Sequence, residues 1–260
     1  MIMRSGRLFA LVWAVIFIIT EFLVSELSKR GYINPTLKKL APLEAMDEFV
    51  GRSAEMGKPV HFTTGYAGGW GVGDRAIMAG LGILQIVAEK CAKIGVPLIN
   101  TIAYGELLPI ADEAMRTGGI MAGEPDWYNP SMNRFIAQEG HSYALGVVET
   151  LESERPGASF AIGNFWSEAL LITESGARLG IPQISGCQEY SAMPFLIAST
   201  DYVLLSPEMY NAQAYVKKDN VLTGAIAGED MIGWFVLIQV FLALILIPVG
   251  INLLSIMRSW

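Results

Sequence analysis

ASFAIGNFWSEALLITESGARLGIPQIS, residues 158–185, is the stretch that decides the fold. An apolar run at 158–162 ends at a glycine, a stretch of helical period follows at 166–179, and a second apolar run comes at 181–185 after Gly180. A strand, a helix and a second strand in this order are typical of two parallel strands joined by a crossover helix. The stretch therefore predicts a parallel sheet covered by helices.

The same alternation continues on both sides of this stretch. The expected strands are 59–62, 96–102, 133–137, 158–162, 181–185 and 202–205, and the expected helices are 43–57, 76–94, 107–117, 142–155, 166–179 and 207–216. The segment 118–130 is rich in Gly, Pro and aromatic residues and is expected to be irregular, and 194–199 stays open between helix and strand. The pattern predicts the α/β class, with a mostly parallel sheet of five or six strands flanked by helices.

Two long apolar runs, 8–24 and 232–257, lie at the ends of the chain. A helix of about twenty apolar residues spans a bilayer, so we expect one transmembrane helix at each end. A cleaved signal peptide is the alternative for the first run, because basic residues precede it. The expected organisation is an N-terminal anchor at 1–27, a soluble α/β domain at 28–230 and a C-terminal anchor at 231–260.

Two such spans place both termini on the same side of a membrane and the domain on the other. Four basic residues between 29 and 39 stand against two before residue 8, which favours a cytoplasmic domain under the positive-inside rule. The expected localisation is a two-pass membrane protein, with membrane lipid and other membrane proteins as partners.

Charge and composition exclude several kinds of site. The chain carries 18 Lys and Arg against 25 Asp and Glu, a formal net charge of −7, so it lacks the basic surface that nucleic acid requires. Its two cysteines, Cys91 and Cys187, cannot form a paired zinc cluster, and His61 and His141 are far apart with no ligand spacing around them. We expect no metal and no cofactor.

A glycine-rich loop, TTGYAGGWGVGDR at 63–75, connects an expected strand to an expected helix. Backbone amides in such a loop, with the positive end of the following helix, can hold an anionic ligand. The loop lacks the Lys-Ser or Lys-Thr ending of a nucleoside triphosphate loop and does not reproduce the dinucleotide fingerprint. The candidate ligand-binding residues here are Gly65, Gly68, Gly69, Gly71 and Gly73; the alternative is a flexible or subunit-contacting loop.

Glu168 is the sixth candidate ligand-binding residue, because it follows a strand and opens a helix, where free amides favour a carboxylate. Glu174 is six residues further on and does not share its face, so an acid/base pair is not expected. Neither Ser167 nor Cys187 has a nucleophile context. We therefore assign no catalytic residue, and the sequence favours a protein that is not an enzyme.

Three blocks carry a resemblance: GRSAEMGKPVHFTTG at 51–65, GNFWSEALLITESGARLGIPQISG at 163–186 and MPFLIASTDYVLLSPEMYNAQAYV at 193–216. In this order they resemble a prokaryotic, membrane-associated family of unknown function, some members of which stand beside fibronectin type III modules. The sequence LSPE at 205–208 departs from the Gly-Glu-Glu pattern expected there. The resemblance implies an architecture and no activity.

Two functions follow as hypotheses. The first is a membrane-anchored structural or scaffold domain that forms a homo-oligomer, because the acidic α/β domain lacks a convergent catalytic set. The second is a small-molecule or nucleotide-binding domain, with or without catalysis, that uses the glycine-rich loop 65–73.

Overall fold

The computed structural model describes residues 7–32, 40–66, 73–217 and 220–246. The chain divides into two compact units. One consists of the two ends of the chain, 1–38 and 217–260, and the other of the continuous segment 39–216. The second unit contains the whole sheet.

The sheet has six strands, all parallel, in the order β3-β2-β1-β4-β5-β6. The strands are β1 (Val60–Thr63), β2 (Leu98–Ile102), β3 (Asn133–Phe135), β4 (Ala158–Gly163), β5 (Gln183–Cys187) and β6 (Tyr202–Leu204). The prediction of a parallel α/β sheet flanked by helices is confirmed. β1 and β4 lie side by side in the middle of the sheet. β2 and β3 extend the sheet beyond β1, and β5 and β6 extend it beyond β4.

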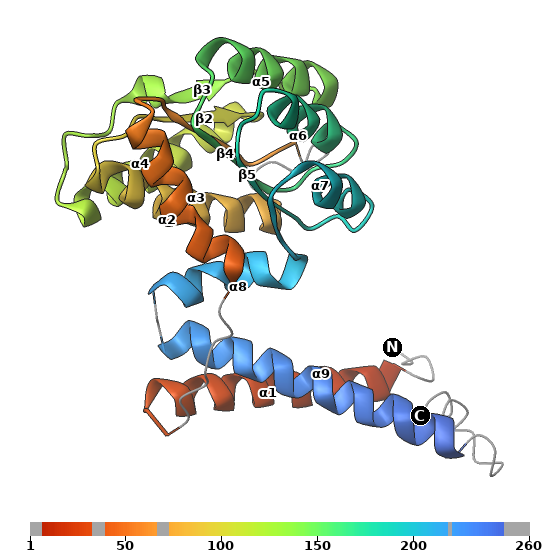
Figure 1. Ribbon diagram of the computed structural model, residues 1–260. Coiled ribbons are helices and arrows are strands. Elements are labelled where there is room, and N and C mark those ends of the chain that lie inside the picture. The colour runs from red at the N-terminus through yellow and green to blue at the C-terminus, as the bar shows by residue number, and fades with distance from the viewer. Residues whose placement is uncertain (1–6, 33–39, 67–72, 218–219, 247–260) are drawn as a thin grey trace. The chain divides into compact units, whose positions relative to one another are not determined.

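Helices cover both faces of this sheet (Figure 1). The helices of this unit are α2 (Ala41–Glu55), α3 (Arg75–Lys93), α4 (Leu108–Ala122), α5 (Gly140–Glu154), α6 (Glu168–Arg178), α7 (Met193–Ser199) and α8 (Ser206–Lys217), with short 3-10 turns at Gly105–Leu107 and Pro130–Met132. α3 packs against α4 and β4, whereas α5 packs against α6 and α6 against α7. The segment at 194–199, open in the sequence, is therefore helical and belongs to α7.

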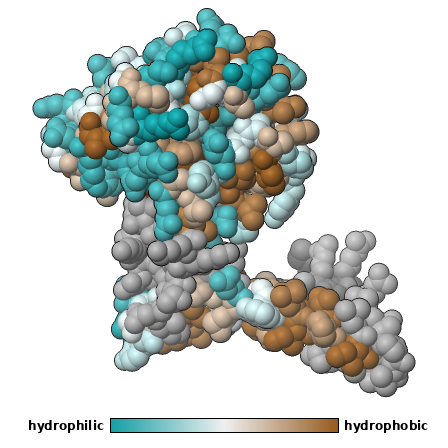
Figure 2. Space-filling model, viewed as in Figure 1, coloured by the Kyte–Doolittle hydropathy of each residue, from teal (hydrophilic) through white to brown (hydrophobic). Residues whose placement is uncertain are grey.

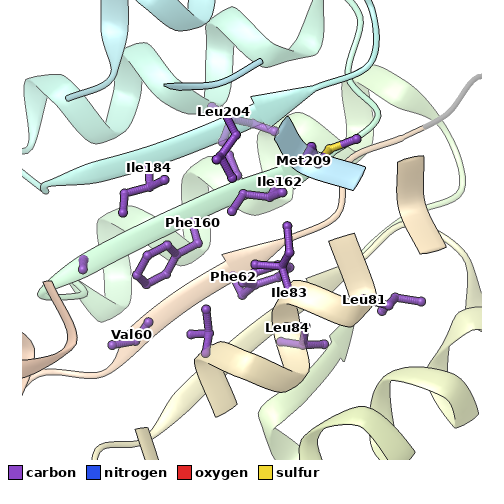
Figure 3. Close-up of a cluster of buried hydrophobic side chains, with 14 of the residues drawn as sticks. Val60, Phe62, Leu81, Ile83, Leu84, Phe160, Ile162, Ile184, Leu204 and Met209 are labelled. Carbon is purple, nitrogen blue, oxygen red and sulfur yellow. The ribbon is translucent and has the colours of Figure 1, made fainter. Parts of the chain in front are cut away.

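The main core lies between the sheet and α3. Phe62 and Phe160 stand on neighbouring strands with their rings stacked at a centroid distance of 6.5 Å, and both are fully buried. Figure 3 shows Ile83 and Leu84 of α3 beside these strands, with Met209 at the far end of the cluster. Burial of large apolar side chains on this face is the main source of stability of the unit.

The opposite face of the central strands is polar although it is buried. His61 on β1 contacts the hydroxyl of Ser159 on β4 through Nδ1 at 2.9 Å and that of Thr101 on β2 through Nε2 at 3.0 Å. Thr101 donates its hydroxyl hydrogen to the carbonyl of Phe62 at 3.3 Å, so it accepts from Nε2–H, and Ser159 donates to Nδ1. Burial, together with the nearby positive charge of Arg134, lowers the pKa of His61 to about 3 and keeps the ring neutral.

Two glycines let α3 approach its neighbours closely. A Cβ at Gly80 would lie 2.3 Å from the carbonyl oxygen of Ile162 on β4. A Cβ at Gly118 would lie 2.8 Å from that of Ala88. The segment 118–122, expected to be irregular, is therefore the last turn of α4, because close packing on α3 outweighs the low helix propensity of glycine.

The first unit contains two long helices that pack against each other, α1 (Arg7–Lys29) and α9 (Asn220–Leu246). The ring centroids of Trp13 on α1 and Phe235 on α9 lie 5.0 Å apart. A Cβ at Gly224 would lie 2.6 Å from that of Ser28, so a small residue is required at this crossing. Figure 2 shows hydrophobic residues on the surface of this pair.

The expected membrane anchors are not found. Among the described residues, no helix combines the length and the apolar character needed to cross a membrane. Glu21 interrupts the apolar run of α1, and in α9 only 231–246 follow the charged residue Asp230 within the described part. The predictions of one transmembrane helix at each end and of a two-pass membrane localisation with a cytoplasmic domain are therefore wrong.

Candidate functional site

The candidate site lies where β1 and β4 end, at the centre of the sheet. After β1 the chain continues through α3 to β2 on one side, and after β4 it continues through α6 to β5 on the other side. In open parallel sheets, ligands bind beyond the carboxyl ends of the strands at such a reversal of strand order. The segments that follow β1 and β4 are thus the first place to look for a ligand site.

These two segments touch through their backbones. The amide of Asn164 donates to the carbonyl of Thr64 at 3.0 Å. A Cβ at Gly65 would lie 2.2 Å from the carbonyl oxygen of Asn164, and one at Gly163 would lie 2.0 Å from that of Thr64. Gly65 also has a φ of +80°, which glycine adopts at little cost. Only glycine fits at both positions.

Asp74 joins the two segments through its side chain. Its Oδ1 accepts from the amides of Ala76 at 2.7 Å and Ile77 at 3.1 Å, which caps α3. Its Oδ2 accepts from the Nδ2 group of Asn164 at 2.7 Å. The carboxylate therefore occupies the position at the start of α3 where a ligand phosphate would otherwise bind.

We expect Asp74→Ala to destabilise the protein by about 1–2 kcal/mol, because the N-cap is lost and the Asn164 amide loses its acceptor. The measurement is the free energy of unfolding in urea. Asp47→Ala is the matched control: Asp47 is exposed and forms a surface ion pair with Lys90, so its loss is expected to cost less than about 0.5 kcal/mol. Equal losses in the two variants would contradict the role given to Asp74.

Two polar atoms at this point have no partner in the part of the chain that the structure describes. They are Oγ1 of Thr64, a residue with no exposed surface, and Oδ1 of Asn164, which is 5% exposed. The second belongs to the amide group that bonds to Asp74, so it lies at the N-terminus of α3. An unpartnered buried polar atom costs about 1–3 kcal/mol, and such groups mark positions that water or a ligand can complete.

Tyr143 of α5 closes the site on the side of β2. Its hydroxyl bonds to the hydroxyl of Thr63 and donates to the carbonyl of Thr101 at 3.1 Å. Burial raises its pKa to about 12. Nearby, the rings of Tyr66 and Tyr104 stack at 5.5 Å. This side of the site is neutral and aromatic.

Glu168 and Cys187 lie on the side of β5. Glu168, the first residue of α6, is only 5% exposed, and its Oε1 accepts from the amide of Trp166 at 3.0 Å. Burial raises its pKa, and the hydrogen bond from the backbone amide of Trp166 opposes that shift. The Sγ of Cys187 accepts from the amide of Phe165 at 3.3 Å, and burial raises the pKa of this thiol to about 11. A protonated thiol is a poor nucleophile, so Cys187 has a structural role here.

Carboxylates also occupy the start of a second helix at this edge. The side chain of Glu139 accepts from the amides of His141 at 3.1 Å and Ser142 at 2.8 Å, which lowers its pKa to about 2. With Asp74 on α3 and Glu139 on α5, the amides that would bind an anion are already in use. The edge therefore favours a neutral polar ligand over a phosphate.

The structure places the six residues expected from the sequence as follows. Gly65 lies in the turn after β1, Gly73 precedes the cap of α3, and Glu168 is buried at the start of α6. Gly68, Gly69 and Gly71 lie outside the described residues. Gly65 and Glu168 are thus on the adjacent segments of the site.

Three residues that bring the two segments together were not expected from the sequence: Thr64, Asp74 and Asn164. A signal was present: Asn164 directly follows a strand that ends at a glycine, and Asp74 directly precedes a helix. Their contact across 90 positions of the chain depends on β1 and β4 being neighbours, which the local pattern does not show. Among the described residues no cluster of His, Cys, Asp and Glu could hold a metal ion.

The fold and the site define a doubly wound α/β domain with a ligand position at the reversal of strand order. Residues 1–257 match the model of the family described as Domain of unknown function (DUF6754), and the chain belongs to that family. A search of the curated proteins and a search of the solved structures gave no match.

Proposed function

We propose that the α/β domain binds a small neutral molecule with hydroxyl or amide groups at the carboxyl ends of β1 and β4. The observation that carries this proposal is a pair of buried oxygens, Thr64 Oγ1 and Asn164 Oδ1, that have no partner among the described residues and belong to the two adjoining segments. A ligand that donates to Asn164 Oδ1 and bonds to the Thr64 hydroxyl would recover the free energy that these atoms lose on burial.

The charges of the site support a neutral ligand. The carboxylate of Asp74 accepts from two amides at the start of α3, and Glu168 adds a second acidic group on the segment that follows β4. A nucleoside or a sugar offers the required hydroxyl and amide groups without the negative charge of a nucleotide phosphate. The aromatic pair Tyr66 and Tyr104 is suited to pack against a planar ring.

The test is thermal unfolding of the full chain with nucleosides, nucleotides, sugars and small amides. At a concentration about a hundred times the Kd, a ligand adds about 2.7 kcal/mol, so the unfolding midpoint rises clearly. We expect Thr64→Val to abolish the rise, because it removes the hydroxyl and keeps the shape of the side chain. A panel without any shift, or a shift that Thr64→Val retains, would contradict the proposal.

Ser175→Ala is the matched control. Ser175 of α6 also has a buried hydroxyl without a partner among the described residues, but it lies two turns beyond the start of its helix. Both substitutions remove a buried, unpartnered hydroxyl, so neither is expected to destabilise the fold. Only Thr64→Val should change the response to ligand.

The chain's self-association into a homo-oligomer with a scaffold role stays a prediction, as does the neighbourhood of fibronectin type III modules in prokaryotic relatives. No catalytic step is part of the proposal.

A further inference from the structure

A hollow lies at the amino-terminal edge of the sheet, opposite the candidate site. It has a volume of about 90 Å³ and is lined by Arg52, Met56, Lys58, Arg155, Pro156, Gly157, Leu179, Gly180, Ile181 and Pro182. These residues come from the end of α2 and from the turns that lead into β1, β4 and β5. We call it the amino-edge pocket.

The amino-edge pocket is basic in an acidic chain. Three of its lining residues, Arg52, Lys58 and Arg155, carry a positive charge and none carries a negative one. In the described ranges none of the three forms an ion pair, although the chain has a net charge of −7. The nearest acidic residue of α5, Glu154, is paired with Arg134.

The backbone at Arg155 gives an independent indication. Arg155 ends α5 in the left-handed conformation, with φ 46° and ψ 56°, and it is the one described non-glycine residue with positive φ. The ends of α2, α3, α4 and α6 place a glycine in this conformation, at Gly57, Gly95, Gly123 and Gly180. A side chain in this conformation costs about 1–2 kcal/mol, which a glycine at this helix end would avoid.

Only one N–H group of the Arg155 guanidinium stabilises the end of α5. Its Nε donates to the carbonyl of Glu152 at 3.0 Å. The other four N–H groups have no partner among the described residues, and they form a fork that matches a phosphate. The carboxyl-terminal ends of α2, α5 and α6 lie at the pocket, and each helix dipole contributes about half a negative charge there. The three full positive charges outweigh this contribution.

The floor of the pocket is rigid. The amide of Gly157 donates to the carbonyl of Pro59 at 2.9 Å, and a Cβ at Gly157 would lie 2.6 Å from Oγ of Ser53 on α2. This close approach fixes the turn that carries Arg155 against the helix that carries Arg52. The turn and the helix that carry two of the three cations are thus fixed against each other, and the three side chains line one pocket from exposed positions.

We propose that the amino-edge pocket binds a phosphate group of a small phosphorylated molecule. Its volume is far below the roughly 300–1,000 Å³ of a pocket for a whole drug-sized ligand, so it suits a single anionic group. This anion site is separate from the neutral site at the other edge, and it does not depend on the function proposed there.

The test is calorimetric titration of the full chain with inorganic pyrophosphate at low ionic strength. We expect saturable binding that weakens as salt is added. Arg155→Gly should weaken it by about tenfold or more. Because glycine accepts positive φ without strain, this variant should unfold at the same temperature as the parent or higher. Arg52→Gln should weaken binding in the same direction.

Arg178→Gln and Thr64→Val are the controls. Arg178 lies in the last turn of α6 at the same edge but does not line the pocket, and Thr64 belongs to the opposite edge. Both variants should bind pyrophosphate as the parent does. The absence of saturable binding, an equal loss in Arg178→Gln, or a loss in Thr64→Val without one in Arg155→Gly would each overturn the proposal.

Discussion

The protein is expected to lose stability as the pH falls from 6.5 towards 3, because of His61. In the unfolded chain a histidine binds a proton near pH 6.5, whereas burial holds the pKa of His61 in the fold at about 3. Between these values the unfolded state binds a proton that the folded state does not. The free energy of unfolding therefore falls by about 1.4 kcal/mol per pH unit, or about 2 kcal/mol between pH 6.5 and 5.

Urea unfolding at a series of pH values from 7.5 to about 4.5 measures this effect. The informative quantity is the slope against pH, since carboxylates such as Glu139 and Glu168 also titrate at the acid end. His61→Gln should remove most of the slope above pH 5, whatever it costs in stability. The hydroxyls of Ser159 and Thr101 can still bond to the amide of the glutamine.

The chain provides its own control, because it has two histidines. The side chain of His141 is 76% exposed at the start of α5, so His141→Gln is the matched control for the replacement of a histidine outside the core. If His61→Gln keeps the slope of the parent, or if the parent shows no slope between pH 6.5 and 5, the buried neutral histidine is not the cause.

Phe160→Ala is expected to destabilise the domain by about 3–5 kcal/mol. Phe160 lies on β4 at the centre of the sheet, has no exposed surface and stacks on Phe62. Its removal loses the transfer free energy of the ring and leaves a cavity that the sheet and α3 cannot close, because the strands are fixed by hydrogen bonds on both sides. The urea midpoint should fall with little change in the m-value.

The control for this substitution is Phe195→Ala. Phe195 of α7 is 40% exposed, so its truncation should cost about 1 kcal/mol or less. If the two variants lose similar stability, the core is not centred on β1 and β4. A loss confined to Phe160→Ala supports the packing that Figure 3 shows.

The ligand sites were predictable only in part. The sequence placed Gly65 and Glu168 at the ends of two strands, and both lie on the adjoining segments of the carboxyl-edge site. The glycine-rich loop predicts an anion site, but the carboxylate of Asp74 already accepts from the amides at the start of α3 on which that prediction depends. The sequence did not predict a role for Arg155, because an arginine at the end of a helix is common. Its left-handed backbone conformation is known only from the structure.

The prediction of membrane spans is wrong because apolar composition does not define where a helix begins and ends. The apolar run 232–257 predicts one span. In the structure α9 begins at Asn220, well before that run, and carries Asp230 within it. Apolar composition alone did not show where this helix begins or that it packs along α1.

The amino-acid sequence by itself determined the local elements, because strand and helix periodicity, the glycines at helix ends and the apolar runs act over a few residues. It thereby determined the α/β class and the parallel sheet. Only the tertiary structure decided the order β3-β2-β1-β4-β5-β6, the turn of α4 at Gly118 and the meeting of Thr64 with Asn164. These features depend on contacts between segments far apart in the chain, such as the approach of β4 to β1 and of α3 to α4. A local sequence pattern does not specify which distant segment packs against it.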